Sequence, residues 1–202
     1  MIALRPIARL AAAPERAAPD VRCELCTMPI GDAHPHVVEI GTRGVLCACR
    51  ACAILFGAGE RTARFRTVPD RVRVDGGFAI TPERLGIPVG VAFCMRDSAR
   101  AQHIACYPGP AGIVDAELPA EAWDALAAAT PLAALLEPDV EALLVRGGRG
   151  QPRAVCYLVP ITAAYDLAGR LRKSWTGFTG GVEAERELAA FFAELDARGG
   201  LP

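Results

Sequence analysis

Two Cys-x-x-Cys pairs near the N-terminus constrain this chain more than any other feature. The pairs are Cys23–Cys26 and Cys49–Cys52, and 22 residues lie between them. Each short turn brings two sulfurs close together, so two such turns can close a tetrahedron of thiolates around one metal ion. We therefore predict a metal site whose ligands are Cys23, Cys26, Cys49 and Cys52.

Further metal-binding side chains lie between the two pairs. Five of the eight cysteines and two of the three histidines fall within residues 23–52. Cys47 and His36 are candidate additional or alternate ligands, and His36 is also able to donate a hydrogen bond to a ligand sulfur. Cys47 is otherwise a redox-active thiol or a small apolar residue. His34, in a loop beside a proline, is expected to be an ordinary loop residue.

The identity of the metal is predicted from the residues that follow each pair. Thr27 and Ala53 stand where the knuckles of rubredoxin-type iron sites usually carry glycine. Zinc is therefore the expected ion. Because donors are in surplus, iron or an iron–sulfur cluster remains the alternative cofactor.

The residues around the second pair predict how the cluster is built. The apolar run 37–40, the turn 41–44 and the apolar pair 45–46 indicate a β-hairpin. If Ile40 pairs with Val45, His36 lies opposite Cys49. Residues 51–56 then form a short helix, whose N-terminus favours the thiolate forms of Cys49 and Cys52 by lowering their pKa. A cysteine knuckle, a hairpin and a cysteine pair at a helix start form a treble-clef-like zinc module.

Composition and charge narrow the class of protein. The 202 residues carry 22 basic and 23 acidic side chains and a net charge of −1 at pH 7, which disfavours nucleic-acid binding because such proteins are usually basic. No apolar run approaches the roughly 18 residues that a membrane-spanning helix needs. The first 20 residues lack the apolar core of a signal peptide. The expected location is the cytoplasm, where cysteines stay reduced.

The rest of the sequence predicts mixed α and β structure. Helical spacing covers residues 119–129, 162–175 and 183–197, and strand-like alternation covers residues 89–95, 104–106, 140–146 and 155–159. Thr162 is the expected N-cap of the second of these helices. Clustered strands with helices between and after them are typical of an α+β fold.

Three segments follow from these patterns. Residues 1–20 are predicted to be a flexible arm, residues 21–60 a cysteine-rich zinc-binding module, and residues 61–202 an α+β domain. The larger domain has no dinucleotide, nucleoside-triphosphate or nucleophile-elbow motif. Its three cysteines, Cys94, Cys106 and Cys156, fall in apolar strand patterns typical of buried thiols. No catalytic residue is therefore predicted.

Several short motifs along the chain carry a resemblance. They are Cys23-Glu-Leu-Cys26, Leu46-Cys47-Ala-Cys49-Arg-Ala-Cys52, Val68-Pro-Asp-Arg71, Tyr107-Pro-Gly-Pro-Ala-Gly112 and Ser174-Trp-Thr-Gly177. In these motifs the chain resembles an uncharacterised family encoded beside nickel–iron uptake hydrogenases of the high-affinity type, over about residues 21–196. That family has no established activity. Its genomic neighbours imply an accessory role, with a hydrogenase subunit or a maturation factor as the partner.

The function expected from these features is that of a zinc-binding accessory protein of nickel–iron hydrogenase. It would act in assembly or maturation, or as a docked interaction component. The alternative is a redox or cluster-delivery protein that holds iron or an iron–sulfur cluster at the same cysteines. The predicted partner contact is the arginine-rich segment that joins the module to the larger domain, with Arg61, Arg64, Arg66, Arg71 and Arg73.

Overall fold

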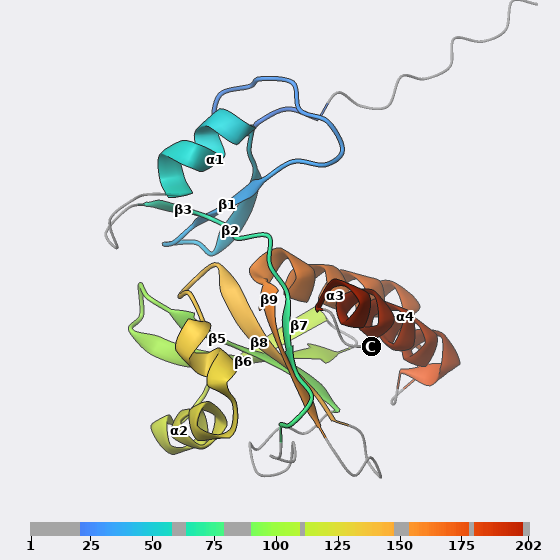
Figure 1. The fold of residues 1–202 in the computed structure, drawn as a ribbon. Helices are drawn as coiled ribbons and strands as arrows, with labels where there is room; N and C mark the ends of the chain where they lie inside the picture. The colour runs from blue at the N-terminus through green and yellow to red at the C-terminus, as the bar shows by residue number, and fades with distance from the viewer. Residues whose placement is uncertain are drawn as a thin grey trace, which may run out of the picture.

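The computed structural model describes residues 21–57, 64–78, 90–109, 112–147, 154–177 and 180–199. These residues form a small N-terminal module and a larger domain (Figure 1). Each part contains one antiparallel sheet, and four α-helices accompany the sheets within the described ranges. The predicted α+β class is confirmed. The predicted arm and Arg61 lie outside the described residues.

The N-terminal module is a three-stranded sheet with one helix. β1 (His36–Glu39) and β2 (Gly44–Cys47) form the predicted hairpin, and β3 (Phe65–Thr67) pairs with the other edge of β1. α1 (Arg50–Gly57) follows β2 and is tied to β3 by a hydrogen bond from the Thr67 hydroxyl to the Ala53 carbonyl. The sheet therefore includes a strand beyond residue 60.

The register of the hairpin differs from the predicted one by two residues. His36 lies opposite Cys47, two positions before the expected partner. The turn is the cause, because the side chain of Thr42 bonds to both members of the closing pair, Glu39 and Gly44. A shift by an even number leaves every side chain on its predicted face of the sheet. The displacement therefore changes which residues are neighbours and leaves the buried face unchanged.

The larger domain is built on a six-stranded sheet in the order β4-β9-β8-β5-β6-β7. Every neighbouring pair is antiparallel. The strands are β4 (Arg73–Asp75), β5 (Val91–Asp97), β6 (Gln102–Gly109), β7 (Gly112–Glu117), β8 (Glu141–Arg146) and β9 (Val155–Pro160).

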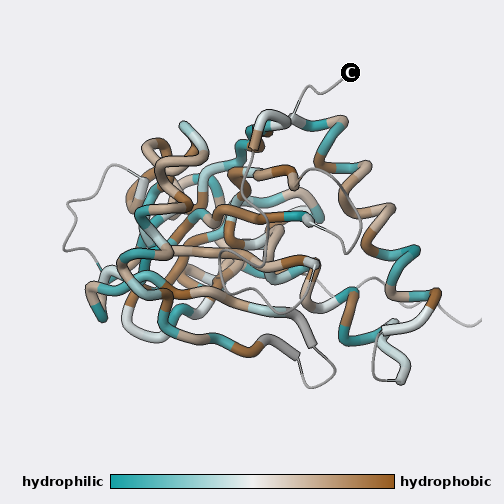
Figure 2. Tube along the Cα trace, turned by 90° about the horizontal axis from the view of Figure 1, so that it is seen from below, coloured by the Kyte–Doolittle hydropathy of each residue, from teal (hydrophilic) through white to brown (hydrophobic). Residues whose placement is uncertain are grey.

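Helices cover both faces of this sheet. α3 (Ile161–Ser174) and α4 (Gly181–Gly199) lie on one face, and α2 (Ala120–Ala129) with a short 3-10 helix (Pro131–Leu135) lies on the other (Figure 1). Alternate residues of β5 therefore enter different cores: Phe93 packs with α3 and α4, and Cys94 with α2. The central strands β5 and β8 are buried on both faces and apolar except near their ends, where Arg96, Asp97, Glu141 and Arg146 lie. Figure 2 shows brown, hydrophobic stretches of chain running through the middle of the molecule.

The start of α3 differs from the sequence prediction. The residue before its first turn is Pro160, not Thr162, and no side chain caps the helix. The fixed φ of proline sets the change from strand to helix at this point. The Ile161 amide, one of the donors that a helix start leaves unpaired, donates to the Val140 carbonyl at 2.9 Å.

The N-terminal module is attached to the larger domain by apolar and charged contacts. Val38 of β1 and Val68 are buried in the core that α3 and α4 cover. Arg43 forms an ion pair with Asp115 of β7 at 3.0 Å, and Arg66 donates to the Pro138 carbonyl at 2.8 Å. These contacts hold the N-terminal module, and with it the cysteine cluster, against the larger domain.

Candidate metal centre

The first cysteine pair lies on a tight turn that its own backbone closes. The Cys23 amide donates to the Met28 carbonyl and the Thr27 amide donates to the Cys23 carbonyl, both at 2.8 Å. Thr27 has a φ of 63°, a conformation that glycine would adopt without strain. Its hydroxyl donates to the Cys26 carbonyl at 2.7 Å. The turn thus fixes the positions of both sulfurs.

The second pair lies at the start of α1. Cys49 directly precedes the helix and Cys52 occupies its first turn. The Cys52 amide donates to the Cys49 sulfur at 3.4 Å, so the sulfur satisfies a backbone donor that the helix start leaves free. The helix N-terminus also carries a partial positive charge that favours a thiolate there.

The four sulfurs come together as the sequence predicts. They all lie within 4.8 Å of one another, and the sulfurs of Cys26 and Cys49 are 3.7 Å apart. A tetrahedron with metal–sulfur bonds of about 2.3 Å has edges of about 3.8 Å. All eight cysteines are free thiols. The group is therefore able to hold a single metal ion.

The electrostatics of the cluster favour a cation among the sulfurs. Burial raises the pKa of the Cys23 thiol, but backbone N–H groups directed at its sulfur, that of Cys49 first, outweigh burial and lower the pKa to about 6. The Cys52 amide lowers the pKa of Cys49. The pKa of Cys52 is raised to about 12, mainly because its thiol hydrogen-bonds to Cys26. Four sulfurs this close cannot all be ionised unless a positive charge lies between them.

The helix start therefore acts on the two cysteines in different ways. The sequence predicts a lowered pKa for both Cys49 and Cys52, and the structure confirms it for Cys49 alone. The Cys52 amide is directed at the neighbouring sulfur, whereas the Cys52 thiol is a donor to the sulfurs around it. The prediction for Cys52 is wrong because the crowding of sulfurs outweighs the helix dipole.

Cys47 and His36 lie in a second group. Their ligand atoms and that of His34 are within 4.8 Å of one another, and the four-sulfur group has none of these residues. Burial first, and then the Glu24 carboxylate, raise the pKa of Cys47, so this thiol is not an activated nucleophile. The sequence interpretation of His34 as an ordinary loop residue overlooked this neighbourhood.

The segment predicted to contact a partner includes arginines that bond within the chain. Arg66 and Arg71 are joined to carbonyls and carboxylates of the larger domain. Arg64 pairs with Glu39 and remains three-quarters exposed, at 74%. Arg73 is exposed on β4. The predicted contact with a partner stays a prediction, and among the described arginines of this segment Arg64 and Arg73 face solvent.

The three cysteines and the histidine of the larger domain are buried or stacked on a ring. Cys94, Cys106 and Cys156 are buried, which raises the pKa of each to about 12. His103 stacks on the Trp123 ring at 3.8 Å between centroids. Buried thiols of this kind stay protonated at neutral pH and do not act as nucleophiles.

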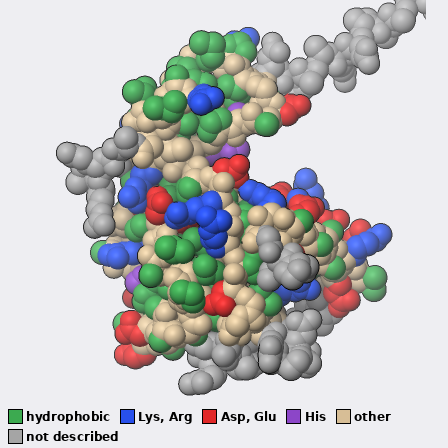
Figure 3. All heavy atoms as spheres, in the orientation of Figure 1, with side chains coloured by type: hydrophobic (Ala, Val, Ile, Leu, Met, Phe, Trp, Pro, Cys, Tyr) green, Lys and Arg blue, Asp and Glu red, His purple; other side chains and the backbone are tan. Residues whose placement is uncertain are grey.

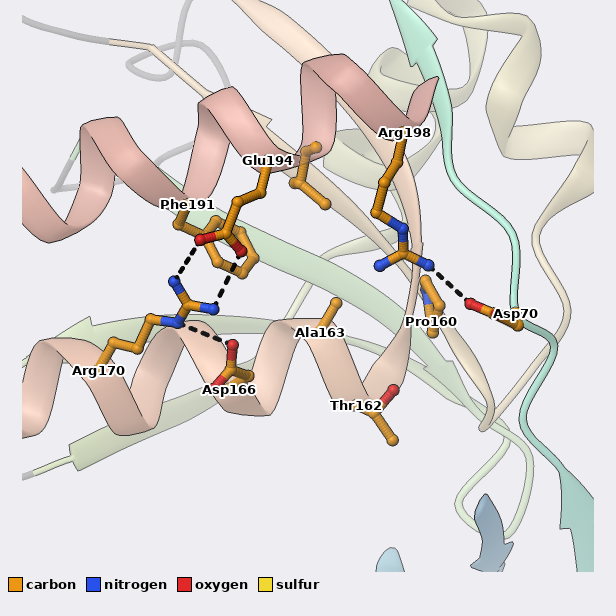
Figure 4. A pocket seen from close by; sticks show the side chains of 10 residues that line it. Asp70, Pro160, Thr162, Ala163, Asp166, Arg170, Phe191, Glu194 and Arg198 are labelled. Carbon is orange, nitrogen blue, oxygen red and sulfur yellow. Dashed lines mark hydrogen bonds and ion pairs between the residues drawn. The ribbon is translucent and has the colours of Figure 1, made fainter. Parts of the chain in front are cut away.

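A groove of about 260 Å³ lies between α3 and α4 (Figure 4). Arg170 bonds there to both carboxylate oxygens of Glu194, at 2.9 and 3.1 Å, and to Asp166. Arg198 pairs with Asp70 at 2.6 Å. The lining thus holds three carboxylates and two guanidinium groups, and each of these five groups is paired with another one, which leaves no charged group of the groove free for a ligand. The cysteine cluster remains the stronger candidate site.

Fold and cluster together define an α+β protein with a four-cysteine module that is able to hold a metal ion. Within the described residues, no helix is long and apolar enough to cross a membrane. The chain belongs to DUF5947, a family of unknown function, which matches residues 22–199. No curated protein and no solved structure matches the chain.

Proposed function

We propose that this chain is a zinc-binding accessory protein of nickel–iron hydrogenase, in which zinc holds the N-terminal module in shape for a partner. The observation that carries the zinc site is the convergence of four sulfurs within 4.8 Å. The link to hydrogenase assembly or maturation comes from the sequence resemblance described above. A hydrogenase subunit or a maturation factor is the proposed partner.

A structural role for the metal is supported by the small core of the module. Its buried members are Cys23, Val37, Ala48 and Cys52, so two of the four are themselves ligands. The other two, Val37 and Ala48, are small, and the larger side chains that pack against them are only partly buried: Leu25, Ile30, Leu46, Phe56 and Phe65. This core therefore buries too little surface to offset the entropy cost of ordering the module. Small modules of this kind are usually folded only with their metal.

The compact arrangement of the sulfurs supports one ion over a cluster. An iron–sulfur cluster with several irons and bridging sulfides requires thiolates that lie farther apart than the four sulfurs of this group. This spacing supports a single ion, and for the alternative function it favours a single iron in a redox protein over an iron–sulfur cluster. Four thiolates from two turns suit zinc, which has no redox chemistry and needs only a tetrahedral site.

The ion can be identified from protein purified without oxygen. We expect a colourless protein with one tightly held zinc per chain after gel filtration. Elemental analysis and a visible spectrum of the same sample measure both properties. One iron per chain, with thiolate-to-iron absorption in the visible, would instead support the redox alternative.

The exposed side of α1 supports the interaction role. Ile54 and Leu55 are 64% and 72% exposed, and Figure 3 shows hydrophobic side chains gathered over α1 on the N-terminal module. Large apolar side chains on a small metal-held module are usual at sites of protein contact. The position of this surface depends on the cysteine cluster, because Cys52 belongs to the same helix as Ile54 and Leu55.

The proposed contact can be tested with purified hydrogenase subunits. Changing Ile54 and Leu55 together to aspartate is expected to weaken binding about tenfold or more, because buried apolar contacts dominate interface energies. Val182→Asp is the matched control, since Val182 is 80% exposed on α4. Binding is measured by calorimetry. An affinity unchanged by the double substitution, or lowered equally by the control, would place the contact elsewhere.

A further inference from the structure

Three donor groups outside the four-cysteine cluster converge in the N-terminal module. His36 of β1 lies opposite Cys47 of β2, and facing residues of an antiparallel pair project from the same side of the sheet. His34 precedes Pro35, and a residue before proline favours an extended conformation, in which side chains two residues apart point the same way. The three ligand atoms lie within 4.8 Å of one another.

One ring nitrogen of His34 is buried and makes no hydrogen bond to the residues that the structure describes. Its Nδ1 lies 2.8 Å from the Gly31 carbonyl oxygen, and because a carbonyl only accepts, Nδ1 carries the proton. Nε2 therefore keeps its lone pair. That atom is buried and has no hydrogen-bond partner among the residues the structure describes. An imidazole that donates one nitrogen to a carbonyl and keeps the other free is oriented as metal-binding histidines are.

The other two donors are also held in place. The ring of His36 lies 4.8 Å from that of His34 between centroids. The Cys47 amide donates to the Glu24 carboxylate, and the Cys47 carbonyl accepts from the Glu24 amide at 2.9 Å. Glu24 thus fixes the backbone of Cys47 and places a negative charge beside it. Donors already positioned in this way lose little freedom when an ion binds.

The donor set differs in chemistry from the four-cysteine cluster. Four thiolates form a closed structural site, whereas three protein ligands leave a coordination position for solvent or for another molecule. Two imidazoles and one thiolate suit late first-row transition metals, and oxygen-preferring ions such as Mg²⁺ or Ca²⁺ are excluded. Figure 3 shows histidine side chains at the surface of the N-terminal module, on the side that faces the larger domain.

We propose that His34, His36 and Cys47 form a second metal site that binds one late first-row divalent transition-metal ion and leaves one coordination position open. The site is separate from the four-cysteine cluster and does not depend on the proposed hydrogenase role. An ion held by three protein ligands exchanges more readily than one enclosed by four sulfurs. The module therefore combines a structural ion with an exchangeable one.

Cobalt titration of the full chain tests this site. Protein with zinc already in the four-cysteine cluster is titrated with Co²⁺ without oxygen. We expect one equivalent to bind without release of zinc, with a thiolate-to-cobalt absorption band and the intense visible bands of four-coordinate cobalt. His34→Ala and Cys47→Ser should each weaken cobalt binding at least tenfold while the tightly held zinc stays. His103→Ala is the matched control and should bind as the unchanged chain does.

Two kinds of result would overturn the proposal. One is cobalt that enters only as zinc leaves, and the other is cobalt binding that neither substitution weakens. Should a variant fail to fold, nitrogen-detected NMR of the unchanged chain during zinc titration decides the question. The coordinating nitrogens of His34 and His36 must then shift with the second equivalent while His103 does not, and shifts confined to other residues count against the site.

Discussion

Replacing Cys49 with serine is expected to remove the tightly held zinc and to unfold the N-terminal module while the six-stranded sheet stays folded. Cys49 supplies a sulfur to the cluster and accepts the Cys52 amide at the start of α1, so the substitution affects both the ion and the helix. Structural zinc contributes about 10–16 kcal/mol to the folding of small modules. Besides the cysteines, this core has Val37 and Ala48 as buried members and five apolar side chains that are only partly buried, and together they do not replace that contribution.

Two measurements check this expectation. Elemental analysis should show the loss of one zinc per chain. Hydrogen exchange should show that the amides of β1, β2 and α1 lose their protection, while those of β5 and β8 keep it. Chelation of the zinc from the unchanged chain should produce the same exchange pattern, since in both cases the same ion is missing.

The control for this experiment is Cys106→Ala. Cys106 is a buried cysteine of β6 in the larger domain, away from both groups of metal-binding side chains. Its loss should lower the stability of that domain slightly and leave the zinc content unchanged. A Cys49→Ser variant with full zinc and a protected α1 would show that Cys49 is not a ligand.

The features predicted best from the sequence depend on residues close together in the chain. The two cysteine pairs, the hairpin turn and the helix that begins after Cys49 are all set by short-range patterns, and the structure has all of them. The central strands β5, β8 and β9 were also predictable. They are buried on both faces, so each is a short apolar run with clear ends.

Elements that no local apolar pattern marks escaped prediction. β7 is an edge strand whose residues 114–117 are exposed, so its sequence lacks the apolar alternation of a half-buried strand. β3 has only three residues and exists because β1 offers a free edge. The neighbourhood of His34 was missed because its neighbour Cys47 is supplied by the register of the hairpin, which the side chain of Thr42 sets. The alternation His-x-His leading into a strand was the signal available in the sequence.

Replacing Arg71 with alanine is expected to destabilise the larger domain by about 3 kcal/mol. This value is at the lower end of the range for breaking a buried ion pair, because Arg71 itself is partly exposed. Glu141 is fully buried at the start of β8. Arg71 donates to its two oxygens at 2.6 and 2.8 Å. Without the guanidinium, the carboxylate would keep only the Glu137 amide as a donor among the contacts that the structure describes. Denaturant unfolding of the full chain measures the loss.

A second substitution separates this charge effect from a loss of packing. Adding Glu141→Gln to the Arg71→Ala variant should recover part of the lost stability, because a neutral amide costs less to bury than an unpaired carboxylate. Arg73→Ala, at an exposed position on β4, should change stability by less than about 0.5 kcal/mol. The ion pair would not stabilise this part of the fold if Arg71→Ala lowered the free energy of unfolding as little as Arg73→Ala does. The same would follow if adding Glu141→Gln recovered none of the lost stability. If both expectations are met, weaker partner binding by an Arg71 variant would reflect a disturbed fold, and Arg64 and Arg73 become the arginines with which to test the contact.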